Sequence, residues 1–242
     1  MPPLGSDTDD LRNTLLRVAG LSAADDEASD LERAEAEALR PVLWTVLSRF
    51  GQQIQRQNQR MRVSQFDLLG APPHRVVFLG SSITEGGRWD EWFPELPTRN
   101  RGVGGDTVDD VAARLDSALN QPLKINLLIG ANDLRDLVEP TGVDDIAARM
   151  ERLVARIRTT VPQAPLYLNS VMPRAQVYAT NVRALNRHYA RIADRAGATY
   201  VDLWSALAGP DGALRPEFTL DELHLTGAGY RAWVEVLRPH LG

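Results

Sequence analysis

Cysteine is absent from this chain of 242 residues, which excludes disulfides, thiolate metal sites and a cysteine nucleophile. No apolar run approaches the roughly 18 residues that a membrane-spanning helix needs, so we expect no membrane span. A basic excess is also missing, because 27 lysines and arginines stand against 32 acidic residues. Surfaces that bind nucleic-acid phosphates usually carry such an excess, so we expect no nucleic-acid partner.

The beginning of the sequence, residues 1–10, has neither the basic residues nor the apolar stretch of a secretory leader. Together with the absence of cysteine, this predicts a cytoplasmic protein. An acidic run from Asp25 to Glu37 is typical of a solvated helical surface.

Residues 1–70 are expected to form an N-terminal helical extension. Between residues 28 and 66, apolar side chains recur at the spacings of one helix face; these are Leu39, Leu43, Val46, Leu47, Phe50, Ile54 and Met61. Pro41 is expected to kink this helix or to start a second one. The apolar stripe would pack either on the rest of the chain or on a second copy, and the latter predicts a homodimer through the N-terminal helices.

Residues 71–242 alternate between short apolar runs and amphipathic stretches. The runs predict strands at 75–79, 124–129, 165–171 and 199–203, and 98–103 is a further candidate strand without an apolar run. The amphipathic stretches predict helices at 106–119, 143–161, 181–196 and 226–237. Alternation of this kind predicts an α/β fold in which parallel strands lie between two layers of helices. In such sheets the functional site lies at the carboxyl ends of the strands.

Four clusters of glycine and polar residues follow these expected strands or precede the last helix. They are Gly80–Gly87, Asn100–Thr107, Gly130–Asp133 and Asp221–Thr226. In the last cluster, Asp221 and His224 are three residues apart, so the carboxylate can hold the imidazole Nδ1 and leave Nε2 as a base. Of the four histidines, only His224 has a carboxylate at this spacing in a loop.

A base of this kind can activate a hydroxyl nucleophile. Ser81, Ser82 and Thr84 are the candidates, all at the first strand-to-helix turn. The same turn could instead simply begin a helix or cradle a phosphate. Acyl transfer would also need donors for an oxyanion, and the Gly105 backbone and the Asn132 side chain can supply them, although each also suits a turn or a helix cap.

Taken in order, the four clusters resemble the sequence blocks of the SGNH hydrolases, the GDSL-like esterase and lipase superfamily. The resemblance covers residues 75–242 and implies Ser82 as the nucleophile, Gly105 and Asn132 as oxyanion donors, and Asp221 and His224 as the rest of the triad. Ser81 stands where the family usually has Asp. That Asp is not the triad acid, so the assignment of Ser82 is kept.

The resemblance implies a three-layer α/β/α catalytic domain over residues 71–242 with a five-stranded parallel, flavodoxin-like sheet, and neither a metal nor a cofactor. The blocks look most similar to members such as platelet-activating-factor acetylhydrolase catalytic subunits and carbohydrate O-acetylesterases. We therefore expect a serine esterase for short acyl groups, acetyl above all, on carbohydrate or small-molecule esters. The alternatives are a lysophospholipase, thioesterase or arylesterase of the same superfamily, or a degenerate domain that only binds a ligand.

Further side chains near the expected site have open roles. Glu85, Trp89 and Arg101 are candidates for binding the leaving group or for ordinary packing, and Met172 is a candidate wall of the acyl pocket. Asp106 and Asp133 are expected to cap or brace loops.

Overall fold

The computed structural model describes residues 30–134 and 142–242. The chain divides into two compact units, Met1–Gln57 and Asn58–Gly242. The first unit contributes most of α2 (Asp30–Leu69), and the second contains the last turns of α2 and all five strands.

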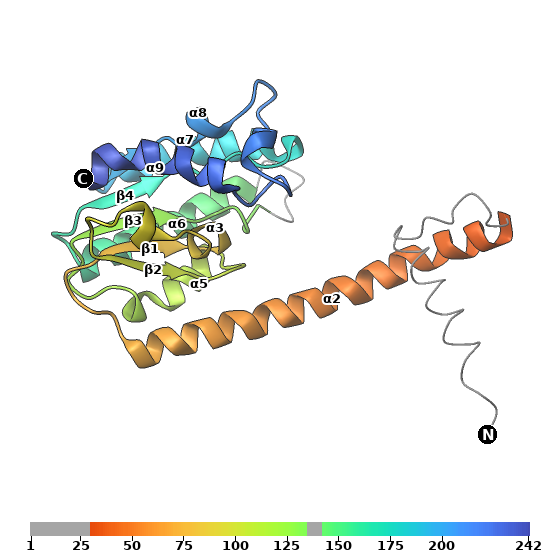
Figure 1. Cartoon of the computed structure of the whole chain (residues 1–242), viewed down its shortest axis with the longest axis horizontal. Helices are drawn as coiled ribbons and strands as arrows, with labels where there is room; N and C mark the ends of the chain where they lie inside the picture. Colours follow the sequence, from red (N-terminus) through yellow and green to blue (C-terminus); the bar gives the residue numbers. More distant parts are fainter. Residues whose placement is uncertain (1–29, 135–141) are drawn as a thin grey trace. The chain divides into compact units, whose positions relative to one another are not determined.

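The second unit is built on one parallel five-stranded sheet, drawn as arrows in Figure 1. Its strands, in the order β2-β1-β3-β4-β5, are β2 (Thr98–Gly102), β1 (Val76–Gly80), β3 (Lys124–Leu128), β4 (Leu166–Asn169) and β5 (Thr199–Val201). All neighbouring pairs are parallel. The five predicted strands are therefore confirmed, and so is the α/β class.

The sheet is covered on both faces, which explains why its central strands are continuous apolar runs. Successive side chains of β1 point to opposite faces: Val77 and Leu79 belong to one core cluster, and Val76 and Phe78 belong to the other. The first cluster includes side chains of α5 (Val108–Ala113), α6 (Val143–Thr160) and α7 (Ala179–Arg195). The second includes side chains of α4 (Trp89–Trp92), α8 (Trp204–Leu207) and α9 (Gly227–Leu241).

Several helices differ in length from the prediction. The helix expected over 106–119 is two pieces, α5 and a 3-10 turn at Leu115–Ser117. The last helix continues through Pro239 to Leu241, so that proline does not end it. Three helices of four residues each, α3 (Ser82–Glu85), α4 and α8, are too short to give a periodic pattern in the sequence.

The N-terminal helix α2 continues through Pro41 from Asp30 to Leu69. The second helix start that was expected at Pro41 is therefore wrong, whereas the alternative, a kink at Pro41, stays a prediction. The boundary expected at residue 70 stays a prediction, although the second compact unit already begins at Asn58. Residues 1–29 and the side chains of Leu39 and Leu43, which enter the predictions above, lie outside the described part.

Within residues 30–134 and 142–242, no helix is both long enough and apolar enough to cross a membrane. The cytoplasmic location stays a prediction.

The central strand β3 generates a stability prediction. Leu127 of β3 is fully buried in the first core cluster, whereas Leu68 at the end of α2 is 90% exposed. We expect Leu127→Ala to lower the free energy of unfolding by about 2–5 kcal/mol because it leaves a cavity. Leu68→Ala should change it by less than about 0.5 kcal/mol. Urea titration followed by circular dichroism measures both, and equal losses would contradict the assigned core.

Candidate active site

The site lies at the carboxyl ends of β1, β2 and β3, where parallel α/β sheets place their ligands. β1 ends at Gly80, and Ser81 leads directly into α3, whose first residue is Ser82. The loop before α9 brings His224 to the same place, 142 residues further along the chain. The fold thus joins the first and the last of the four clusters.

Three of the predicted residues form one hydrogen-bonded chain. The Ser82 Oγ lies 2.8 Å from the His224 Nε2, and the His224 Nδ1 lies 2.6 Å from the Asp221 Oδ2. Ser81 and Thr84, the other candidate nucleophiles, are buried. Ser82 is the one of the three that meets the imidazole, and the hydroxyl–imidazole–carboxylate order can pass a proton from the hydroxyl to the ring.

The loop from Thr219 to Thr226 holds the carboxylate and the imidazole in place. Thr219 and Leu225 form an isolated antiparallel bridge, and the Thr226 N–H donates to the Phe218 carbonyl at 2.8 Å. Asp221 Oδ1 accepts the backbone N–H of His224 at 2.7 Å. The backbone therefore orients the Asp221 carboxylate through Oδ1, and the other oxygen, Oδ2, contacts the imidazole ring.

These contacts also set the ionisation of Asp221. Burial opposes its charge, but hydrogen bonds from the His224 side chain and from backbone N–H groups outweigh this and lower the pKa of Asp221 to about 2. The carboxylate is thus ionised throughout the pH range in which an imidazole titrates.

Gly105 lies in a tight turn, Val103–Asp106, called the oxyanion turn below. The Asp106 N–H donates to the Val103 carbonyl at 3.2 Å, and Gly105 has a φ of 82°. This is the conformation that the third residue of a type II turn needs and that glycine adopts without strain. A second bond, from the Val103 N–H to the Gly80 carbonyl at 3.1 Å, ties the turn to the end of β1.

Asn132 follows β3 and lies against the oxyanion turn. Its Nδ2 donates to the Asp106 carbonyl at 2.8 Å, which fixes the orientation of the amide beside Gly105. The structure therefore places all five predicted residues at one edge of the sheet. His224 contacts both Ser82 and Asp221, and Asn132 contacts the carbonyl of Asp106, the residue after Gly105.

A buried arginine that the sequence analysis missed, Arg114, joins the end of β1, just before Ser82, to the oxyanion turn. The Arg114 Nε donates to the Asp106 Oδ2 at 2.7 Å, and its Nη2 donates to the Gly80 carbonyl at 3.0 Å. Burial raises the pKa of Asp106 to about 6, against the opposing effect of Arg114. Arg114 lies at the end of α5, and nothing in its local sequence marks this long-range contact.

The other candidates have structural roles. Trp89 is buried and stacked on Phe78, with ring centroids 4.0 Å apart. Arg101 is buried and lies over the Phe66 ring at 4.4 Å. Trp89 and Arg101 are thus committed to packing rather than to a leaving group.

The two aspartates expected to brace loops, and Met172, also have structural contacts. Asp106 braces the oxyanion turn, as described above. Asp133 accepts the Val108 N–H at the start of α5 and pairs with Arg149 at 3.0 Å. Met172 is buried in the second core cluster.

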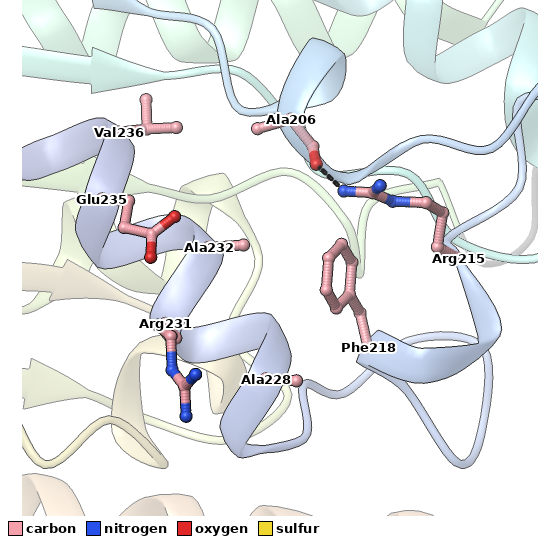
Figure 2. A pocket seen from close by; sticks show the side chains of 8 residues that line it. All are labelled: Ala206, Arg215, Phe218, Ala228, Arg231, Ala232, Glu235 and Val236. Atoms are coloured by element: carbon pink, nitrogen blue, oxygen red, sulfur yellow. Dashed lines mark hydrogen bonds between the residues drawn. The ribbon is translucent and has the colours of Figure 1, made fainter.

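A separate hollow of about 460 Å³ lies between α8, α9 and the turn that carries Phe218. Figure 2 shows its lining, with Phe218 and Arg215 on one side and Arg231 and Glu235 of α9 on the other. Arg215 donates to the Ala206 carbonyl and lies over the Phe218 ring. None of the five predicted site residues lines this hollow.

Among the residues that the structure describes, no three metal-ligating side chains lie close enough together to hold an ion. The polar groups that line up behind the Ser82 hydroxyl are instead the His224 imidazole and, beyond it, the Asp221 carboxylate.

Comparison with known proteins assigns the chain to a family. Residues 78–232, well over half of the chain, match the model of the GDSL-like lipase/acylhydrolase family. The chain belongs to this family, within the SGNH hydrolases, and is a carboxylic ester hydrolase. The predicted class is thereby confirmed.

Relatives and solved structures agree with this assignment. Platelet-activating factor acetylhydrolase IB subunit alpha2 of Rattus norvegicus is 27% identical over 166 residues, which cover 64% of this chain and 70% of the relative. A Streptococcus pneumoniae protein described as a platelet activating factor superposes with a TM-score of 0.73 at 24% identity, covering 82% of this chain and 99% of its own. An acetyl xylan esterase from Geobacillus stearothermophilus superposes with a TM-score of 0.57 at 22% identity, covering 72% and 96%.

The low pKa of Asp221 generates a prediction for the pH profile. Since Asp221 stays ionised until the pH approaches 2, the acid limb of kcat/KM should report one proton, taken up by the imidazole base as the pH falls. Asp221→Asn should lower kcat by about 10⁴-fold, because the ring loses its orientation and its charge support.

Initial rates on p-nitrophenyl acetate between pH 4 and 9 measure both effects. An acid limb that reports two protons would show that Asp221 titrates with the imidazole and would contradict the account.

Proposed function

We propose that this protein is a serine esterase for short acyl esters, with Ser82 as nucleophile, His224 as base and Asp221 as the acid that orients it. The observation that carries the proposal is the chain Ser82 Oγ–His224 Nε2–Asp221, with separations of 2.8 and 2.6 Å. A serine hydroxyl is a poor nucleophile at neutral pH, and a base within hydrogen-bond distance supplies what it lacks.

In the proposed reaction, His224 Nε2 takes the hydroxyl proton of Ser82 as Oγ attacks the ester carbonyl. The tetrahedral intermediate carries a negative oxygen, which the backbone N–H groups of Ser82 and Gly105 and the Asn132 amide stabilise. His224 then gives its proton to the leaving alcohol. A water, deprotonated by His224, releases the acyl group from Ser82.

The proposed substrates are acetyl esters of carbohydrates or small molecules. Two observations support this: the relatives named above include an acetylhydrolase and an acetyl xylan esterase, and the sequence blocks resemble those of acetylhydrolase-like members. The alternatives are a lysophospholipase, a thioesterase or an arylesterase with the same nucleophile. A ligand-binding domain without activity is disfavoured, because such a domain would not need a hydroxyl, an imidazole and a carboxylate joined in one hydrogen-bonded chain.

The ester series acetate, butyrate, octanoate and palmitate, each as the p-nitrophenyl ester, tests the proposal. We expect the highest kcat/KM on acetate or butyrate and no rate above background for Ser82→Ala. Asn132→Ala should retain binding but lose about 100- to 1000-fold in kcat, because one oxyanion donor is removed.

A rate that rises with chain length would favour a lipid or thioester substrate. A hydrolytic rate that survives Ser82→Ala would overturn the proposed nucleophile, and an unchanged kcat in Asn132→Ala would remove that residue from the oxyanion site.

We also propose that the chain forms a homodimer through α2. Apolar side chains lie exposed along this helix, among them Val42, Val46, Leu47, Phe50 and Ile54. The sequence before this stretch, 25–37, is predominantly acidic, whereas residues 38–66 contain five arginines and no acidic residue. Two antiparallel copies would cover the apolar face and bring the acidic part of one helix beside the basic part of the other.

Light scattering should give the wild-type chain twice the monomer mass of 26.7 kDa. Phe50→Asp should return it to the monomer because a carboxylate is placed in the apolar seam. Val177→Asp, at an exposed position outside α2, is the matched control and should stay dimeric. A wild-type monomer would contradict the proposal.

A further inference from the structure

The last turns of α2 reach the oxyanion turn, although they precede the region that the family model covers. Gln59, Arg62 and Phe66 are three and four residues apart and share one helix face. The Gln59 Nε2 donates to the Asp106 Oδ1 at 3.2 Å, and the Phe66 ring lies under the Arg101 guanidinium. All these contacts lie within the second compact unit.

Arg62 contacts the turn through Glu85, the last residue of α3. Glu85 Oε2 accepts the backbone N–H of Gly104 at 2.6 Å, and its other oxygen, Oε1, lies 3.3 Å from the Arg62 Nε. The same Nε is 3.5 Å from the Gly102 carbonyl, just before the turn. One carboxylate thus bridges a helix side chain and the backbone of the oxyanion turn.

Gly104 lies between this carboxylate and the nucleophile. A methyl group placed on Gly104 would be 3.2 Å from Glu85 Oε2 and 3.8 Å from the Ser82 Cβ. The bond from the Gly104 N–H to Glu85 therefore holds the Val103–Gly104 peptide. The next peptide along the chain carries the Gly105 N–H, which is the proposed oxyanion donor. A donor displaced by about 1 Å can cost about 100-fold in rate.

A carboxylate beside an oxyanion site also has a cost, because it repels the negative oxygen of the intermediate. Arg62 offsets this repulsion, since its guanidinium pairs with the same carboxylate. Both side chains are about one-third exposed, so water screens the repulsion only in part.

We propose that Glu85 and Arg62 are positioning residues for ester hydrolysis: Glu85 holds the oxyanion turn through the Gly104 N–H, and Arg62 neutralises the Glu85 charge. This inference rests on the proposed Ser82 mechanism and adds a role for α2 in it. Neither side chain touches the substrate in this scheme; both act through the backbone of the turn.

The test compares variants of the full chain on p-nitrophenyl acetate. Glu85→Ala should lower kcat about 10- to 100-fold with KM changed by less than about threefold, because the turn relaxes only where the oxyanion forms. Glu85→Gln should lose less, because the amide oxygen still accepts the Gly104 N–H. Arg62→Ala should lower kcat because it leaves the carboxylate unpaired.

A double variant tests separately whether Arg62 acts by neutralising the Glu85 charge. In the Arg62→Ala background, adding Glu85→Gln should raise kcat again, since it removes the unpaired charge but keeps the acceptor. A trifluoromethyl ketone that forms a tetrahedral adduct with serine should bind each variant more weakly by the factor that kcat/KM falls. A merely structural loss would lower the active fraction without changing this affinity.

Glu91→Ala is the matched control. Glu91 is an exposed glutamate of α4 that pairs with Arg88, the residue before this helix, so its removal should leave kcat unchanged. Wild-type kcat in Glu85→Ala would overturn the inference, as would a double variant no faster than Arg62→Ala. If Glu85→Ala does not fold, Glu85→Gln, Arg62→Ala and their combination carry the test.

Ser82→Ala, measured in parallel, distinguishes failure of the proposed Ser82 mechanism from failure of the proposed roles of Glu85 and Arg62. Activity that survives Ser82→Ala overturns the proposed mechanism and the inference with it. Activity that Ser82→Ala abolishes but Glu85→Ala leaves intact overturns the inference alone.

Discussion

The site depends on the buried contact between Arg114 and Asp106. These side chains are only 5% and 3% exposed, and Arg114 donates both to the Asp106 carboxylate and to the Gly80 carbonyl. One guanidinium therefore fixes the distance between the end of β1, where Ser82 begins α3, and the turn that carries Gly105. Loss of one partner from a buried pair typically costs about 3–5 kcal/mol, so the two loops cannot readily separate.

Around this contact, the polar side chains of the site are fixed in orientation by further hydrogen bonds to the backbone. The Asp221 carboxylate is held by backbone N–H groups before it meets His224, and the Asn132 amide is held by the Asp106 carbonyl. The proposed role of Glu85 extends the same arrangement to the last turns of α2. Groups fixed before the reaction need no reorganisation when charge develops, which is why a site of this kind can stabilise an oxyanion.

The sequence predicted the strands well because a strand buried on both faces is a continuous apolar run, as in β1 and β3. The contact between Asp221 and His224 was also predictable, since it spans only three residues. The choice among Ser81, Ser82 and Thr84 was not predictable from composition, because it depends on which hydroxyl the turn into α3 exposes. Arg114 was missed for a related reason: its partners lie 8 and 34 residues away, and such contacts leave no local pattern.

The central claim is that Ser82 is an activated nucleophile, and covalent labelling tests it most directly. The full chain would be treated with a fluorophosphonate, and the modified residue identified by tandem mass spectrometry. We expect a single adduct on Ser82 that disappears in His224→Ala, because the hydroxyl then has no base. The absence of an adduct, or an adduct on a different serine, would contradict it.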